Sequence, residues 1–451
     1  MVQRLDQARL RLCSSLGFLL ISCCVATFSD IIAATILPPI LPFALPDRAN
    51  VPNSQVELCV TLLPAIQAAT VVLSTPFAGW FSDRCRRRKP LFVAAVIVQS
   101  VGVTFLIIGT HIALWIIGQM ILGFGSAMVW TNTLALIVDT VPEAQLARFL
   151  GYTSLSLSLG VFLGPVLGGV MYEHAGNHGV WSMMCGIFFL DLMLRVLLVE
   201  PQSKLRENTA DAEDHSRPPR KRTQFVAPLL LKSARMLSAL WATFAHAAVL
   251  GSFDATLTVH VKELFGWSSQ TAGLLFMALA LPEFASPLVG AWADRVGGRW
   301  IAAAGFLLSP AVLVCLRFVD EDNVSDKVLL AALLSLLDCL LGTTVPIFCA
   351  ETGHVVMELE RKNPGVCGSK GAFAQAQGLW WAAYTLGLTI GILWAGFVQR
   401  AAGWATMAWS LAIMSGLTTI PVVMFTGDSL KEDGTHSSSG DEDQSLKCCN
   451  K

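Results

Sequence analysis

Charged residues are scarce in this sequence, and their scarcity excludes whole classes of protein. Only 14% of the 451 residues are Asp, Glu, Lys or Arg, and 54% are hydrophobic. Soluble globular domains carry roughly 25% charged residues. The formal net charge is −1, so the chain also lacks the basic field that a nucleic-acid-binding surface needs. An ordinary soluble core and a nucleic-acid partner are therefore both excluded.

Patterns that hold metals, build disulfide frameworks or carry catalysis are missing too. The 12 cysteines are scattered, with no CxxC pair and no Cys/His cluster at metal-ligand spacing. No nucleotide-binding loop and no nucleophile triad occurs. We therefore expect no metal, no cofactor, no ATP-driven pumping and no enzymatic activity.

The chain instead contains a series of long apolar stretches. A helix needs about 20 predominantly apolar residues to cross a bilayer. Twelve stretches approach or exceed this length: 16–42, 57–82, 91–109, 112–138, 146–173, 180–199, 237–263, 270–292, 300–318, 327–350, 371–398 and 403–425. No small-residue cleavage site follows the first stretch, so we expect a retained helix there and not a signal peptide. The expected fold class is all-α, with twelve transmembrane helices.

Basic residues indicate the orientation of these helices. Lys and Arg in short loops stay on the cytosolic side of a membrane. The N-terminus, the Arg84–Lys89 loop and the 200–236 segment are basic, whereas the alternate connections 174–179 and 319–326 are not. Both chain ends are therefore expected in the cytosol.

The expected organisation has five parts. They are a cytosolic N-terminus (1–15), a six-helix half (16–199), a polar cytosolic linker (200–236), a second six-helix half (237–425) and a disordered, acidic, Ser-rich cytosolic tail (426–451). Asn323 begins an N-glycosylation sequon in a short loop on the outer side.

One short sequence motif occurs twice in the chain. Residues 76–90 read PFAGWFSDRCRRRKP, and residues 287–300 read PLVGAWADRVGGRW. At a constant separation, Pro76, Gly79, Asp83, Arg84 and Arg88 recur as Pro287, Gly290, Asp294, Arg295 and Arg299. Membrane topology requires only the basic residues. We interpret the repeats as a first latch (Gly79, Asp83, Arg84, Arg88) and a second latch (Gly290, Asp294, Arg295, Arg299) on the cytosolic face. The glycine admits a neighbouring helix, and the aspartate bonds backbone donors or an arginine.

A second pair of similar segments supports an internal duplication. Residues 160–169 read GVFLGPVLGG, and residues 387–396 read GLTIGILWAG. Gly160, Gly164 and Gly168 are four apart and share one helix face, and small residues at that spacing permit tight packing of membrane helices. Pro165 adds a kink or hinge, and Gly169 completes the motif. The glycines could serve only to pack the helices tightly, or they could allow this helix interface to move; the sequence leaves both roles open.

These motifs carry a family resemblance. The pattern G-x-x-x-D-R-x-x-x-R after the second helix resembles the signature of the major facilitator superfamily. GxxxGPxxGG in the fifth helix is similar to the motif of its proton-coupled drug antiporters. The first, sixth and seventh helices, with SDIIAATILPPILP, DLMLR and GSFDATLTVHVKELFGW, resemble the vesicular amine transporter branch and its fungal relatives. In the fourth helix, Gln119 stands where the superfamily usually has an arginine linked to proton transfer. The resemblance covers residues 16–425 and implies two pseudo-symmetric six-helix halves that alternate access to a central site.

Carboxylates inside the apolar stretches are the candidate site residues. An acid at the centre of a membrane helix costs roughly 2.5–3.5 kcal/mol on insertion scales, and such acids usually mark function. Asp30 and Asp254 lie in helices that occupy equivalent places in the two halves, and Asp338 and Glu283 are further candidates for binding substrate or protons. A structural role for Asp30 and an interfacial position for Asp254 are the alternatives. One buried carboxyl holds a proton or a cationic substrate, but not easily both, which is a physical basis for exchange.

Other polar and aromatic residues have more ordinary interpretations. Asp191 and Arg195 are four apart on one helix face, a spacing suited to a structural ion pair. His246 is either a core residue or a proton relay. Trp130, Trp380 and Trp381 either line a cavity for an aromatic or apolar ligand or simply pack within the membrane.

Together these features predict a secondary transporter at the plasma membrane or a vacuolar or vesicle membrane. The hypothesis is proton-coupled antiport, by efflux or vesicular loading, of a small organic substrate of cationic or drug-like character. The protein would be a monomer in the lipid bilayer. A uniporter or symporter on the same fold is one alternative, and a non-transporting membrane sensor or scaffold is another.

Overall fold

The structure is a computed structural model. It describes residues 15–37, 40–49, 51–85, 88–199, 225–267, 275, 278–279, 281–367 and 372–427. Nearly all of the predicted N-terminus and tail, and most of the predicted linker, lie outside the described residues.

The described chain is helical along almost its whole length. The first half contains α2 (Leu16–Thr35), α3 (Leu41–Ala49), α4 (Asn53–Arg84), α5 (Lys89–Ile108), α6 (Ile112–Thr140) and α7 (Leu146–Leu197). The second contains α9 (Ala227–Leu230), α10 (Ala234–Phe265), the short turn η2 (Pro282–Ala285), α12 (Ser286–Val296), α13 (Gly298–Cys315), α14 (Val324–Leu341), α15 (Val345–Lys362) and α16 (Phe373–Phe425).

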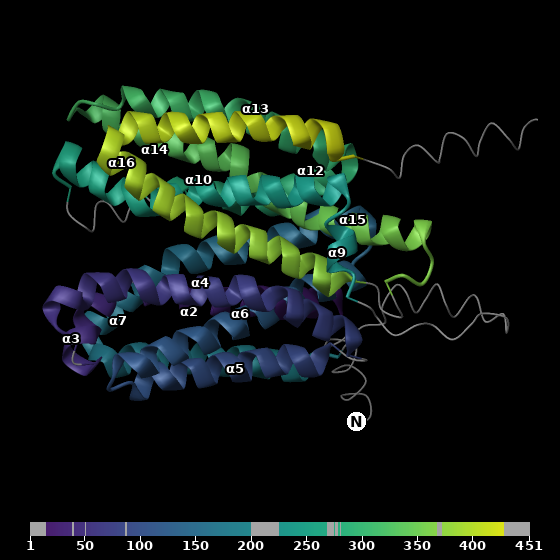
Figure 1. The fold of residues 1–451 in the computed structure, drawn as a ribbon, viewed down its shortest axis with the longest axis horizontal. Helices are drawn as coiled ribbons and strands as arrows, with labels where there is room; N and C mark the ends of the chain where they lie inside the picture. The colour runs from purple at the N-terminus through teal and green to yellow at the C-terminus, as the bar shows by residue number, and fades with distance from the viewer. Residues whose placement is uncertain are drawn as a thin grey trace, which may run out of the picture.

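Nine helical stretches in the described residues are long and apolar enough to cross a membrane. Two of them, α7 and α16, have 52 and 53 residues and are far longer than a bilayer requires. Each turns at a glycine of positive φ, Gly176 (61°) and Gly403 (82°), and so supplies two crossings. Figure 1 shows α16 running out along the molecule and back. Part of the predicted span 270–292 lies outside the described residues, and the twelve predicted spans are consistent with this arrangement.

Large apolar side chains cover the outside of these helices. Leu73, Phe77, Leu288 and Phe397 are each at least 66% exposed. In water such a surface would be unfavourable, whereas in lipid it is the expected surface of a spanning helix whose backbone hydrogen bonds are all internal.

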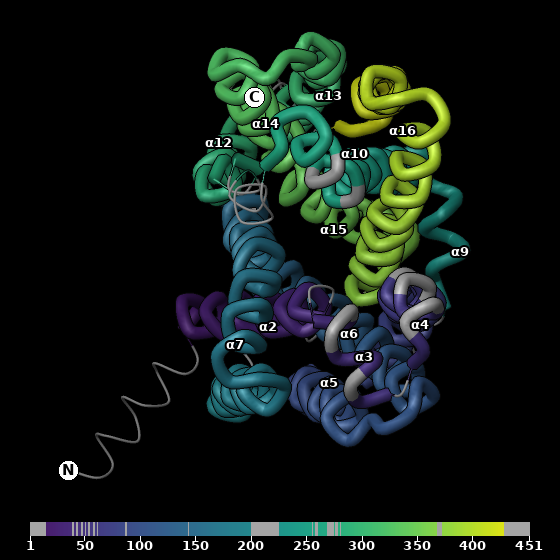
Figure 2. The backbone as a smooth tube through the Cα atoms, turned by 90° about the vertical axis from the view of Figure 1, so that its left-hand side faces the viewer, coloured from purple at the N-terminus to yellow at the C-terminus, as the bar shows by residue number. Residues whose placement is uncertain are grey.

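The helices form two bundles, α2–α7 and α10–α16 (Figures 1 and 2). Within the first bundle the glycine face of α7 packs against α2. A Cβ on Gly164 would lie 2.0 Å from the Thr35 hydroxyl oxygen, and the Thr35 hydroxyl donates to the Gly160 carbonyl over 3.1 Å. A Cβ on Gly169 would have no atom of the described residues within 4 Å, and Pro165 is exposed. The predicted glycine face therefore serves an interface inside one half.

The second bundle repeats this packing. A Cβ on Gly387 or Gly391 of α16 would lie 2.3 or 2.1 Å from a carbonyl oxygen of α10, that of Phe244 or Ala248. The sequence similarity between residues 160–169 and 387–396 thus corresponds to equivalent helix pairs in the two halves, α7 with α2 and α16 with α10.

The two bundles meet along two flanks, α4 with α16 and α12 with α7 (Figure 2). On the first flank, a Cβ on Gly378 would lie 2.8 Å from the Thr75 carbonyl oxygen. On the second, a Cβ on Gly151 would lie 2.8 Å from the Ser286 carbonyl oxygen. The same close approach of backbones therefore recurs at both flanks.

Candidate functional site

The first latch joins α4 of the N-terminal half to the first turn of α16. The Asp83 carboxylate accepts the backbone N–H groups of Ala374 (3.1 Å) and Gln375 (3.0 Å). Gly79 makes this approach possible, because a Cβ there would lie 2.6 Å from the Ala374 carbonyl oxygen. The carboxylate thus satisfies free N–H groups at the positive end of a helix, an arrangement that contributes about 0.5–2 kcal/mol in helix caps.

The second latch has the same geometry with the halves exchanged. The Asp294 carboxylate, at the end of α12, accepts the N–H groups of Ala147 (2.9 Å) and Arg148 (3.0 Å) in the first turn of α7. A Cβ on Gly290 would lie 2.4 Å from the Ala147 carbonyl oxygen. In each latch, one half therefore caps a helix of the other half at the end that the basic loops assign to the cytosol.

The latch arginines differ in what they contact. Arg88 is fully buried and pairs with Asp83 over 3.2 Å and with Asp139 of α6 over 3.8 Å. Arg299, its counterpart, donates instead to the Val423 carbonyl near the end of α16. Arg84 is exposed and stacks on Trp80. Arg295 is likewise exposed. The first latch is thus a buried ionic network, whereas the second is a half-buried cap.

Gln375 ties the inter-half connection to the first latch. Its side-chain oxygen accepts the N–H groups of Val226 (2.8 Å) and Ala227 (3.2 Å), at the start of α9. Its side-chain nitrogen faces Asp83 over 3.4 Å. All four residues are nearly or fully buried, so the end of the connecting segment is packed into the contact between the halves.

Asp30 lies deep in the N-terminal half, 3% exposed. Its carboxylate accepts hydrogen bonds from the amide of Gln99 on α5, the hydroxyl of Ser126 (2.8 Å) and the indole N–H of Trp130 (2.7 Å) on α6. A carboxylate with three donors is well solvated by the protein even though water is excluded.

A structural ion pair lies beside Asp30. Arg195 donates to both oxygens of Asp191, over 2.7 and 2.6 Å, and to the Phe92 carbonyl over 2.6 Å. The Ser29 hydroxyl also donates a hydrogen bond to the Asp191 carboxylate. Both charged groups are fully buried and have hydrogen-bond partners, the condition under which a buried pair is tolerated.

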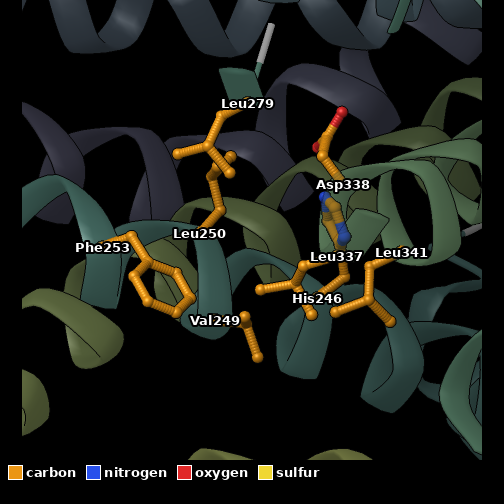
Figure 3. Close-up of a pocket in the computed structure, with 8 residues that line it drawn as sticks. All are labelled: His246, Val249, Leu250, Phe253, Leu279, Leu337, Asp338 and Leu341. Atoms are coloured by element: carbon orange, nitrogen blue, oxygen red, sulfur yellow. The ribbon is translucent and has the colours of Figure 1, made fainter. Parts of the chain in front are cut away.

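The C-terminal half contains a second set of buried acids. Asp338 of α14 lines a small cavity together with His246 of α10 (Figure 3). The Glu283 carboxyl lies close enough to that of Asp338 for the two charges to repel, and Ser158 of α7, in the other half, is its polar neighbour. One oxygen of each acid and Nδ1 of His246 have no hydrogen-bond partner among the described residues. Free buried acceptors of this kind favour a bound proton, water or cationic ligand.

Aromatic rings lie between the two sets of acids, in a cluster that we call the aromatic stack (Trp130, Trp380, Trp381 and Tyr384). Trp130 of α6 and Trp381 of α16 stack with centroids 3.8 Å apart at 11°, and Tyr384 follows at 5.3 Å from Trp381. His246 lies 6.2 Å from Tyr384. The indole N–H groups of Trp380 and Trp381 lack partners within the described chain, although buried indoles usually have one.

The remaining candidates lie outside these two sets of buried acids. Asp254 is half-buried on α10 and, with Glu283 and Asp338, is an electrostatic neighbour of Tyr384. Gln119 is buried in α6. Asn323 caps α14 by accepting the Asp326 N–H over 2.7 Å.

Sequence reasoning missed the neutral partners of these acids. Gln99, Ser126 and Ser158 are single polar residues in apolar helices, and Gln375 opens a helix. An isolated amide in an apolar stretch is the available signal, but its partner is on another helix and becomes visible only in the fold. No group of three or more His, Cys, Asp or Glu suited to a metal is present in the residues that were described.

The family follows from comparison with known proteins. The family model of the Major Facilitator Superfamily matches residues 23–352 and 242–448, most of the chain, so the protein belongs to this superfamily. It is a multi-pass membrane transporter by that membership and by its apolar helices.

Individual relatives agree. An MFS-type transporter of Schizosaccharomyces pombe is 29% identical over 410 residues, covering 85% of this chain and 90% of the relative. The class B tetracycline resistance protein of Escherichia coli is 25% identical over 307 residues, covering 66% and 72%. The crystal structure of the human organic anion transporter MFSD10 aligns with a TM-score of 0.66 at 18% identity, over 90% of this chain and 99% of that chain. That likeness shows the fold alone.

Proposed function

We propose that this transporter is a proton-coupled antiporter that exports a small organic substrate of cationic or drug-like character from the cytosol, or loads it into a vacuole or vesicle. The observation that carries the proposal is a pair of buried acid sites, one in each half, on either side of the aromatic stack. Asp30 lies in the N-terminal half, and Glu283 and Asp338 lie in the C-terminal half.

The two sites suit different occupants. Asp30 already has three donors, so a proton is the ligand that it can exchange with least rearrangement. Glu283 and Asp338 each keep one oxygen that has no partner in the described part of the chain, beside aromatic rings, and such surroundings attract an organic cation. Two nearby like charges in a buried site are stabilised by either a proton or a cation, so the occupants compete.

The latches supply the conformational part of the mechanism. Asp83 and Asp294 join the halves at the cytosolic ends, so they stabilise the state that is open to the outside. Opening toward the cytosol breaks both caps, and the halves rock about the central site. The name of the tetracycline resistance relative is consistent with export of a drug-like substrate.

Flux in proteoliposomes tests the function. We expect at least one member of a panel of organic cations to move against its gradient when a pH gradient is imposed, and to slow when the gradient is collapsed. Flux that ignores the pH gradient would favour a uniporter, a reading that the neutral Gln119 also fits. Flux in the same direction as protons would favour a symporter. No flux of any member, with normal cellular function after neutralising Asp30, would favour a sensor or scaffold.

A further inference from the structure

Trp130 is the one described donor to Asp30 that also touches the other half. Gln99 and Ser126 stay within the N-terminal bundle, whereas the indole ring of Trp130 stacks on Trp381 of α16. The N–H edge of the ring contacts a carboxylate of one half, and its face contacts a tryptophan of the other. A single side chain therefore connects the N-terminal acid to the contact between the halves.

The charge of Asp30 must affect this side chain. A hydrogen bond from an indole N–H to a carboxylate is charge-assisted and roughly twice as strong as its neutral counterpart. Protonation removes the charge and turns one acceptor oxygen of Asp30 into an O–H donor. The three surrounding donors then share fewer acceptor sites. The indole then loses the bond that fixes its position, while its stacking on Trp381 depends on that position.

We propose that Trp130 is a positioning residue that couples the protonation of Asp30 to the contact between the two halves. With Asp30 charged, the Trp130 ring is held against Trp381 and the cytosol-closed arrangement is stabilised. With Asp30 neutral, the ring is released and the α6–α16 contact loosens. The inference rests on the proposed proton coupling and adds the side chain that would transmit it.

The other groups around Asp30 do not supply the same connection. On α7, Arg195 is near enough to act on Asp30 electrostatically, but its guanidinium is already paired with Asp191 and the Phe92 carbonyl. On α5 the facing group is the neutral amide of Gln99, and on α6 it is the hydroxyl of Ser126. These contacts set the electrostatic environment of Asp30 within its own half.

Hydrogen–deuterium exchange of the full-length protein in nanodiscs tests the proposal without knowledge of the substrate. In the wild type we expect exchange in the first turns of α16 (373–384) to rise as the pH falls between about pH 8 and about pH 5, after correction for intrinsic rates. Trp130→Phe keeps an aromatic ring but removes the N–H, so the pH response should be lost. Trp381→Leu should lose it too, because the ring contact is broken on the other side.

A matched control lies on the same helix. Trp115 is a fully buried tryptophan of α6 whose indole N–H donates to the neutral Gly109 carbonyl over 3.1 Å and not to a carboxylate. Trp115→Phe also removes a buried indole hydrogen bond, but one to a neutral acceptor, and should keep the wild-type pH response. Asp30→Asn should show the low-pH exchange at every pH, and adding Trp130→Phe to it should change nothing further.

The outcomes separate the inference from the proposed function. A wild-type pH response in Trp130→Phe would overturn the inference, as would a wild-type protein whose α16 exchange neither changes with pH nor differs from Asp30→Asn. If cation flux is proton-driven while Trp130→Phe behaves like Trp115→Phe, the function stands and the inference fails. If no cation in the panel moves but the exchange response depends on Trp130, the inference stands and the function fails.

Discussion

At the scale of single residues, the notable feature is how differently the buried acids are solvated. Asp30 is surrounded by donors from two neighbouring helices, whereas Glu283 and Asp338 each keep one oxygen without a partner in the described chain. A carboxyl that already has donors can ionise inside the membrane at lower cost than one that lacks them. The first kind of site suits proton exchange, and the second suits a ligand that brings its own donors.

Replacing Asp30 by Asn tests the acid without changing its size. The amide still fits among Gln99, Ser126 and Trp130, so folding and surface expression should remain near wild type. It cannot take up a proton, so substrate movement driven by a pH gradient should fall at least tenfold, or about 1.4 kcal/mol. Uptake into vesicles with and without the gradient measures this, and unchanged driven uptake would exclude Asp30 from proton coupling.

At the scale of elements, glycines determine how closely the helices approach. Gly164→Val would place side-chain atoms against Thr35 and force α7 away from α2. Overpacking of this kind costs typically 1–3 kcal/mol, so we expect a lower melting temperature in detergent. Gly169→Ala, on the open side of the same helix, is the control and should melt like the wild type. Equal melting of both variants would mean that α7 and α2 separate without penalty.

The first latch can be tested as a unit of helix capping. Asp83→Ala removes the acceptor for two N–H groups of α16 and leaves Arg88 without one of its two carboxylates. The central site is untouched, so turnover should slow more than substrate binding weakens. Initial rates and equilibrium binding measured on the same preparation separate the two effects. A parallel loss of both would argue against a role as a latch.

The sequence predicted these elements well because their cause is local. Apolar length specifies the spans, and the repeated Gly and Asp specify where two backbones meet around a carboxylate. The sequence did not reveal that Arg84 and Arg295 are exposed, or that Arg88 reaches Asp139 while Arg299 reaches the end of α16. A long, flexible arginine selects its partner from what the fold brings near, and α6 and α16 are far from the motif along the chain.

At the scale of the whole molecule, the two latches act on one face and should act together. Removing both, with Asp83→Ala and Asp294→Ala, should shift the population toward the cytosol-open state more than either change alone. Cys367, just after α15, is fully buried and lies close enough to Asp83 of the other half for that carboxylate to act on it electrostatically, so its thiol should become reactive when this face opens. Mass spectrometry after thiol labelling measures the shift.

The control for this labelling is Cys23, which is fully buried within the N-terminal bundle and should stay unreactive in every variant. Labelling of Cys23 and Cys367 together would indicate unfolding. Labelling of Cys367 that is the same in the double variant and in the wild type would mean that other contacts keep the face closed.

The capture of the Val226 and Ala227 amides by Gln375 has a consequence for how the two halves are joined. The described downstream end of this connection, at the start of α9, is itself part of the contact between the two halves. If the two halves were synthesised as separate polypeptides with the cut upstream of residue 225, α9 would stay on the same fragment as Gln375. A cut between Leu231 and Ala234 would instead leave α9 on the N-terminal fragment, apart from Gln375.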